Sequence, residues 1–219
     1  MTKSRASNFT SRKQELQAIL QRRDFEALLA WAKKHRNPIR SLISFQFNPD
    51  PLICMRAVEA LGKVAVLYDP DDLETLRKAI GRFFWMMNDE SGNVGWYSAE
   101  SIGEILHNVP ALIPEYAHML PSFLVEEPFE KGTRIAIARV AQIDKSPFDV
   151  PTCKKLVQSL KDPNPEIRGS SLIALKALQT ENIEDRVKKL LDDKSKVQMY
   201  NFATGNLEEA AIAELAGKF

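Results

Sequence analysis

The residues best suited to molecular recognition lie around Trp96, in the middle of the chain. If this segment is helical, Trp96, Glu100, Gly103 and Glu104 occupy positions i, i+4, i+7 and i+8 and share one helix face. A tryptophan beside two carboxylates, with a glycine that leaves space, would form a groove suited to a basic or aromatic group of a partner. Two further acids precede this helix and would lie at the rim. The predicted binding residues are therefore Trp96, Glu100, Glu104, Asp89 and Glu90.

The same segment also has a purely structural interpretation. Trp96 could fill an oversized gap between two repeats, and Phe84 and Trp85 are expected to belong to the core. Asp89 would then act as an ordinary helix cap. Both interpretations stay open at the level of sequence.

Motifs of the common catalytic classes are absent from the sequence. The three histidines, His35, His107 and His118, have no second metal ligand three or four residues further on. The chain contains neither a phosphate-binding glycine loop nor a nucleophile elbow. Cys54 and Cys153 stand alone and are expected to be buried reduced thiols. We predict no catalytic residue, no metal and no cofactor, so a non-catalytic role is favoured and an enzymatic one is left open.

Charge is unevenly distributed, although the net charge of the chain is only +1. Residues 1–40 contain ten Lys and Arg against three acids, a balance of +7, whereas residues 69–130 have a balance of −9. Duplex binding needs a continuous cationic track that displaces counterions. The acidic middle of the chain therefore disfavours nucleic acid as the partner, although the basic segment could touch phosphates.

An apolar period of 3.6 residues restarts along almost the whole chain, which predicts a succession of amphipathic helices. Sustained strand-like alternation is not found, so we expect essentially no sheet. All twelve prolines fall at or near proposed helix ends, with Pro121 fitting least well. The expected helices cover 12–21, 24–35, 51–68, 72–87, 95–107, 111–125, 131–143, 150–161, 165–179, 182–192 and 207–217.

Comparable helix tails recur along the chain, which indicates internal repeats. Their leading apolar residues are spaced by 41, 38 and 35 positions, and we expect all of them to be buried: Leu61, Ile102, Val140 and Leu175. A turn rich in acids or prolines precedes each long helix. One acid in each of three turns is expected to cap the long helix that follows: Asp50, Asp89 and Asp162.

One of these repeats resembles a known family. The run from Asp162 to Arg168, Asp-Pro-Asn-Pro-Glu-Ile-Arg, followed by Ala174-Leu175, is similar to the HEAT-repeat pattern, in particular to the short bacterial repeats of phycobilisome-lyase-type proteins. In the second and third tails the usual arginine position is held by Gly95 and Thr133. The stretch from Trp85 to Gly92 also resembles the signature of a small group of uncharacterised bacterial HEAT-like proteins, which implies no chemistry.

The resemblance and the helical period together predict one all-α domain over residues 1–219. It would be an α-solenoid of about five HEAT-like antiparallel helix pairs, with residues 1–10 as a candidate disordered tail. Such a fold implies a protein-interaction scaffold that binds a partner segment on its concave surface. The alternatives are a HEAT-like nucleic-acid-binding protein or DNA glycosylase and, by fold analogy alone, a chromophore lyase. No apolar run approaches a membrane-spanning length and no apolar region follows the basic N-terminal residues, so we expect a cytoplasmic protein. We also expect a monomer or weak dimer.

Overall fold

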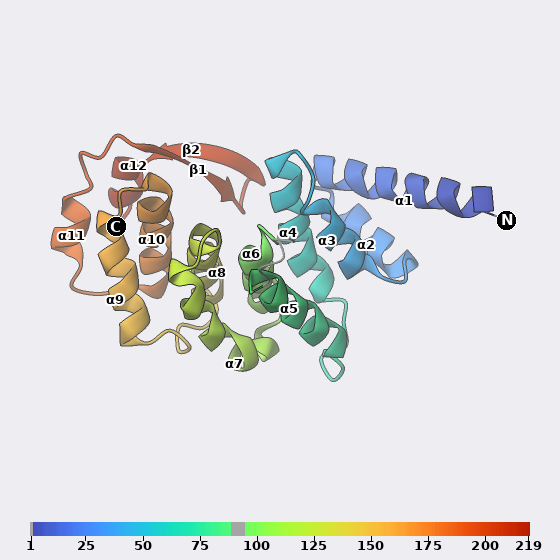
Figure 1. Cartoon of the computed structure of the whole chain (residues 1–219), viewed down its shortest axis with the longest axis horizontal. Helices are drawn as coiled ribbons and strands as arrows, with labels where there is room; N and C mark the ends of the chain where they lie inside the picture. Colours follow the sequence, from blue (N-terminus) through green and yellow to red (C-terminus); the bar gives the residue numbers. More distant parts are fainter. Residues whose placement is uncertain (1, 89–94) are drawn as a thin grey trace.

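The computed structural model describes residues 2–88 and 95–219, with side chains described from Ser11 onward within these ranges. Its helices pair and stack in chain order along the long axis of the molecule (Figure 1). The first three pairs are α1 (Thr2–Arg22) with α2 (Phe25–Lys34), α3 (Pro38–Phe45) with α4 (Pro51–Ala65), and α5 (Glu74–Met87) with α6 (Ser98–Asn108). The backbone of residues 2–10, the candidate tail, belongs to α1.

The last two pairs have an irregular first member. In the fourth, η1 (Pro110–Leu112), α7 (Ile113–Tyr116) and η2 (Ala117–Val125) precede α8 (Glu130–Ala141). In the fifth, α9 (Val150–Gln158) and η3 (Ser159–Lys161) precede α10 (Pro165–Leu178). Pro121 lies inside η2, which accounts for its poor fit to an α-helical boundary. The predicted α-solenoid of stacked helix pairs is confirmed.

The second helices of successive pairs pack against one another, α4 on α6, α6 on α8 and α8 on α10. These helices carry the four apolar residues that lead the repeated tails. All four are completely buried, which confirms the alignment of the repeats: Leu61, Ile102, Val140 and Leu175. Each helix pair therefore buries its remaining apolar face against the next pair, as expected for a solenoid.

Side chains in the turns satisfy free amides at the starts of the long helices. Asp50 caps α4 by accepting a hydrogen bond from the Leu52 amide at 2.9 Å, as predicted. The prediction for Asp162 is wrong, because Asn164 caps α10 by accepting from the Glu166 amide at 2.9 Å. Asp162 accepts instead from the Asn164 amide at 2.8 Å and so shapes the turn before the helix. Asp89 lies outside the described residues.

Two arginines in the second helices donate to backbone carbonyl oxygens at or before the start of the same helix. Arg168 donates to the carbonyl oxygens of Asp162 at 2.7 Å and Pro163 at 3.0 Å. In the preceding repeat, buried Arg134 donates to the carbonyl oxygens of Leu124 and Glu130 at 2.9 and 2.8 Å. The arginine that the sequence pattern lacks at Thr133 is therefore supplied one position later.

The C-terminal part of the chain differs from its prediction. After α11 (Glu184–Lys188), the strands β1 (Lys196–Asn201) and β2 (Asn206–Ala211) form an antiparallel hairpin, which leads into α12 (Ile212–Ala216). The helix expected over 207–217 is therefore restricted to its second half, and the expectation of essentially no sheet is wrong for these two strands. Pairing between strands does not depend on local helical period, so the period alone could not reveal it.

The hairpin crosses the molecule from α10 and α12 toward the first helix pairs (Figure 1). Near its tip, the carbonyl oxygen of Phe202 accepts a hydrogen bond from Arg23 at 2.6 Å, and that of Gly205 accepts one from Arg56 at 3.0 Å. Gly205 has a φ of 71°, and the Arg23 side chain occupies the space that a Cβ atom would need. The C-terminal hairpin is thus hydrogen-bonded to the N-terminal helix pairs.

No helix among the described residues combines the length and the hydropathy that a membrane span requires. Of the two cysteines, Cys54 is buried and Cys153 is half-buried, and both are free thiols.

Candidate binding groove

A groove with a volume of about 630 Å³ lies at the N-terminal ends of the second helices. Met55 of α4, Glu100 of α6 and Ile135 of α8 contribute to it, and Met199 and Tyr200 of β1 form part of its wall. Because these residues come from four distant segments, the groove exists only when the repeats are stacked and the hairpin lies across them. Its volume is in the range of ordinary ligand-binding pockets.

Trp96 lies at this groove and has 61% of its surface exposed. Since α6 begins at Ser98, Trp96 belongs to the turn before the helix and not to its face, in contrast to the helical spacing assumed from the sequence. The expectation for Trp85 is also wrong, because this residue is 58% exposed, whereas Phe84 is buried as predicted. The structural interpretation of Trp96 as a buried filler is therefore not supported.

Glu100 lies at the base of the groove and has only 9% of its surface exposed. Its Oε2 atom is buried and accepts no hydrogen bond from any described residue. Burial raises the pKa of this carboxyl to about 7, and the positive charge of Lys131 opposes the rise. A buried carboxylate oxygen without a hydrogen-bond partner costs stability, and a donor bound beside Glu100 would offset this cost.

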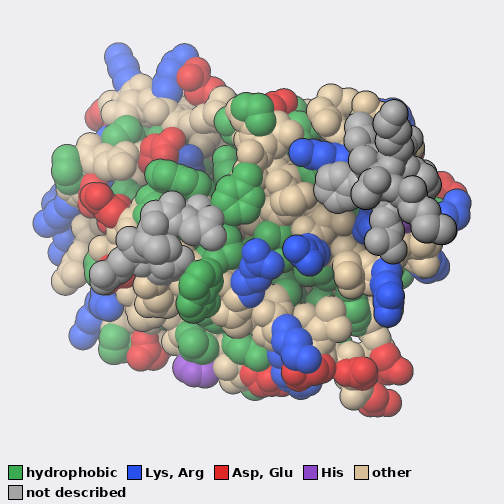
Figure 2. Space-filling model, turned by 45° about the vertical axis from the view of Figure 1, so that its right-hand side comes forward, with side chains coloured by type: hydrophobic (Ala, Val, Ile, Leu, Met, Phe, Trp, Pro, Cys, Tyr) green, Lys and Arg blue, Asp and Glu red, His purple; other side chains and the backbone are tan. Residues whose placement is uncertain are grey.

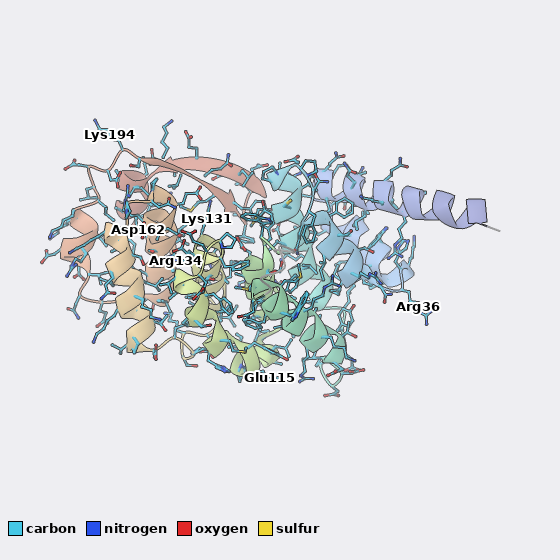
Figure 3. The ribbon with its side chains drawn as sticks, in the orientation of Figure 1. Arg36, Glu115, Lys131, Arg134, Asp162 and Lys194 are labelled. Atoms are coloured by element: carbon cyan, nitrogen blue, oxygen red, sulfur yellow. The ribbon has the colours of Figure 1, made fainter. Side chains whose placement is uncertain are left out.

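Gly132 on α8 makes room for this carboxylate. A Cβ atom at Gly132 would collide with both carboxylate oxygens of Glu100. The neighbouring Lys131, labelled on α8 in Figure 3, forms an ion pair with Glu166 at 2.9 Å and donates to the Gln198 carbonyl oxygen at 3.0 Å. Lys131 is thus engaged by α10 and the hairpin, and Glu100 forms no ion pair with a described residue.

Glu104 is not brought to the groove. It is completely buried on another part of α6, where Arg139 of α8 forms an ion pair with its carboxylate. The guanidinium of Arg139 also lies 4.3 Å from the centre of the Phe202 ring, so this pair supports the hairpin. The other two predicted site residues, Asp89 and Glu90, lie outside the described residues. The structure therefore brings together Trp96 and Glu100 of the predicted set.

The contributions of Lys131, Gly132 and β1 to the groove were not predicted from the sequence. A weak signal for the strand exists, because Val197 and Met199 alternate with polar residues and a Thr-Gly turn follows. No group of three or more His, Cys, Asp or Glu side chains among the described residues has a geometry that could hold a metal ion.

Comparison with known proteins is informative for the fold alone. No protein-family model matches the chain. An uncharacterized protein of Archaeoglobus fulgidus is 28% identical over 166 residues, which cover 73% of this chain and 84% of that protein. Among solved structures, an engineered protein superimposes with a TM-score of 0.55 at 14% identity, covering 89% of this chain and 81% of that one.

Two repeat proteins are more distant. A designed armadillo repeat protein gives a TM-score of 0.48 at 18% identity, with 93% and 91% of the two chains covered. An archaeal HEAT-like repeats protein from Thermococcus onnurineus gives 0.38 at 15% identity, with 94% of each chain covered. The match to a phycobilisome-lyase type and to the Trp85–Gly92 signature stays a prediction.

Proposed function

We propose that this chain is a non-catalytic interaction scaffold that binds a basic segment of another protein in the groove beside the hairpin. A lysine or arginine side chain of the partner would enter the groove and form an ion pair with Glu100, while the adjoining part of the segment packs on Trp96. The observation that carries this proposal is the buried, unpartnered carboxylate oxygen of Glu100 at the base of an open groove.

Three properties of the groove support a cationic occupant. Among the described residues of the groove, Glu100 is an acid without an ion-pair partner, since Lys131 is paired with Glu166. The exposed indole of Trp96 provides a flat surface that attracts the aliphatic stem or the cationic end of a long basic side chain. Burial strengthens an ion pair formed at Glu100, because the surroundings screen charge less than water does.

The acidic residues at the groove do not suit a nucleic acid. Phosphates would have to approach Glu100 and Glu166, with Lys131 already engaged by both α10 and the hairpin. Among the described side chains on the face that Figure 2 shows, basic, acidic and hydrophobic groups are intermixed. A glycosylase or a lyase would in addition need a free reactive group in the pocket. Among the described groove residues, Lys131 is paired with Glu166 and the Tyr200 hydroxyl donates to Glu59.

Synthetic peptides test this proposal without knowledge of the natural partner. A library of immobilised ten-residue peptides with one central Lys or Arg, flanked by apolar or aromatic residues, would be probed with the purified chain. We expect selective retention of basic peptides and loss of this retention when the central residue is replaced by norleucine or Glu.

Two matched substitutions assign the binding to the groove. Trp96→Ala should weaken the selected peptides at least about tenfold, as expected for a central aromatic anchor. Trp85→Ala removes a tryptophan of similar exposure on α5, away from the groove, and should leave binding unchanged. If both substitutions weaken binding equally, or if peptides bind irrespective of charge, the groove is not the recognition site.

A further inference from the structure

A second pocket, with a volume of about 560 Å³, lies between the first three helices and is separate from the groove. Arg12 and Lys13 of α1 and Arg40 of α3 provide three positive charges, and none of the described residues that line the pocket is acidic. The apolar part of its wall is formed by buried Trp31 and Phe45. The pocket is thus basic, whereas the groove contains the acids Glu100 and Glu166. It lies in the basic N-terminal segment, to which the proposed scaffold function assigns no role.

Two residues that line this pocket each carry a buried donor atom with no hydrogen-bond acceptor among the described residues. The donor atoms are the Nε atom of Arg12 and the Nε1 atom of Trp31. Both atoms can only donate, because neither a guanidinium nor an indole N–H offers an acceptor lone pair. The Arg12 guanidinium is held in place by its Nη2 atom, which donates to the Ser41 hydroxyl at 2.9 Å, and by its position 5.1 Å from the centre of the Trp31 ring. The arginine and the indole N–H, which lie next to each other, could therefore both donate to one ligand that carries several acceptor atoms.

The charge of the pocket favours a dianion over a carboxylate. Arg12, Lys13 and Arg40 together carry a charge of +3 with no acid at the pocket, whereas a carboxylate would neutralise only one of these charges. A phosphate monoester carries nearly two negative charges at neutral pH and offers three oxygen atoms to several donors at once. Arginine also matches the geometry of phosphate oxygens with its planar set of donors.

An adjoining hollow of about 280 Å³ extends the positive surface. It shares Asn37 and Arg40 with the pocket, and Lys78 and Arg82 of α5 lie on its other side. Lys78 is partly neutralised by Glu74 at 3.4 Å, whereas Arg40 faces both cavities. The space beside the pocket is therefore favourable for negative charge and unfavourable for a cationic ligand.

We propose that the pocket between α1, α2 and α3 binds a small organic phosphate, with its phosphate group at the Nε atom of Arg12 and the Nε1 atom of Trp31. Lys13 and Arg40 at the mouth of the pocket neutralise the remaining charge. The ligand is small because the pocket is closed on its inner side by buried aromatic rings and has a volume that suits a single metabolite.

Calorimetric titration of the full chain with inorganic phosphate and with glycerol 3-phosphate tests the proposal, and chloride at the same ionic strength serves as the reference. Both phosphates should bind at one site. Arg12→Gln should weaken binding at least about tenfold, the effect of losing one charge-assisted contact. Lys34→Gln makes the same change of charge on an exposed residue of α2 outside the pocket and should leave the dissociation constant within about twofold.

Arg12 also contacts Trp31, so the thermal unfolding of Arg12→Gln must be compared with that of the wild type. Arg40→Gln provides a second test, because this exposed side chain can be changed without loss of a buried contact, and it should weaken phosphate binding by a smaller factor than Arg12→Gln. The proposal is overturned if the wild type does not bind either phosphate, or if Arg40→Gln and Lys34→Gln have the same effect. Binding of a duplex oligonucleotide without binding of either small phosphate would also overturn it, in favour of a nucleic-acid surface.

Discussion

The hydroxyl of Tyr200 on β1 donates a hydrogen bond of 2.5 Å to the Glu59 carboxylate on α4 and thereby joins residues 141 positions apart in the chain. The same carboxylate accepts from Arg23 at 2.6 and 2.9 Å. Burial and the bond to Glu59 raise the pKa of the Tyr200 hydroxyl, so the hydrogen-bonded phenol is retained over the whole neutral range. This contact connects the hairpin that follows the last repeat to the first repeats. It also holds β1 in the position where it forms a wall of the groove.

Removing this hydroxyl should loosen the hairpin without removing its apolar contacts. We expect Tyr200→Phe to lower the free energy of unfolding by about 1–2 kcal/mol, since a buried hydrogen bond to a charged acceptor is lost. Urea unfolding followed by circular dichroism would measure the change. The matched control is Tyr116→Phe, because the hydroxyl of Tyr116 has no hydrogen bond to another described side chain, and its loss should change stability by less than about 0.5 kcal/mol. Equal effects of the two substitutions would contradict the role given to Tyr200.

Two helical glycines should respond in opposite directions to the same substitution. A Cβ atom at Gly103 would lie 2.6 Å from the Cα atom of Ala136, so Gly103→Ala must force α6 and α8 apart and should destabilise by about 1–3 kcal/mol. Gly81 on α5 has no atom within 4 Å of such a Cβ, so Gly81→Ala should stabilise by about 0.5–1 kcal/mol through helix propensity. Thermal unfolding of both variants measures the pair. If Gly103→Ala stabilises the protein, α6 and α8 do not approach each other as closely at Gly103 as described.

Burial of Glu100 should make stability depend on pH. The pKa of its carboxyl is about 7 in the folded chain, above its ordinary value of 4.5, so the folded state binds the proton more tightly than the unfolded state. Tighter proton binding by Glu100 therefore adds to the free energy of unfolding. This stabilisation is fully present below pH 4.5, is lost as the pH rises through 7, and amounts to about 3 kcal/mol in total. The side chain in Glu100→Gln is neutral at every pH. Its free energy of unfolding should therefore rise relative to that of the wild type, by up to that amount, between pH 5 and pH 8.

Urea unfolding of both proteins at several pH values checks this prediction. Glu115→Gln is the control, because the Glu115 carboxylate is exposed and paired with Arg77 at 2.8 Å, which lowers its pKa. This control should not gain stability relative to the wild type as the pH rises. A wild-type stability that differs from that of Glu100→Gln by a constant amount at all pH values would show that Glu100 is not buried as described.

Most of the fold could be predicted because it follows from local chain properties. Burial of Leu61, Ile102, Val140 and Leu175 follows from their equal place in the repeated tails. The hairpin could not be predicted in this way. The segment Asn206–Ala211 reads Asn-Leu-Glu-Glu-Ala-Ala, which favours a helix, and it forms a strand because it pairs with Lys196–Asn201 and lies across the second helices.

The candidate site was predictable only in part for the same reason. The sequence places Trp96 and Glu100 close together because they are four residues apart, and both reach the groove. It also suggested that Glu104, one turn further on, faces the same groove. Arg139, 35 residues later, instead pairs with Glu104 inside the stack, and no local pattern could indicate that partner. The wall formed by Tyr200 likewise depends on the long-range course of the hairpin.

The most direct test of the proposed function is the titration of the Glu100 carboxyl in the free chain and with a bound lysine peptide. The carboxyl carbon of Glu100 would be followed by carbon-13 NMR from pH 4 to pH 9 and assigned with Glu100→Gln. The free carboxyl should titrate near its pKa of about 7, and a peptide with a central lysine should lower that pKa by at least about one unit, since the ammonium group favours the ionised form. A norleucine peptide should not lower it. If the lysine peptide binds and the Glu100 titration does not move, the carboxylate is not the recognition group and the account of the groove is wrong.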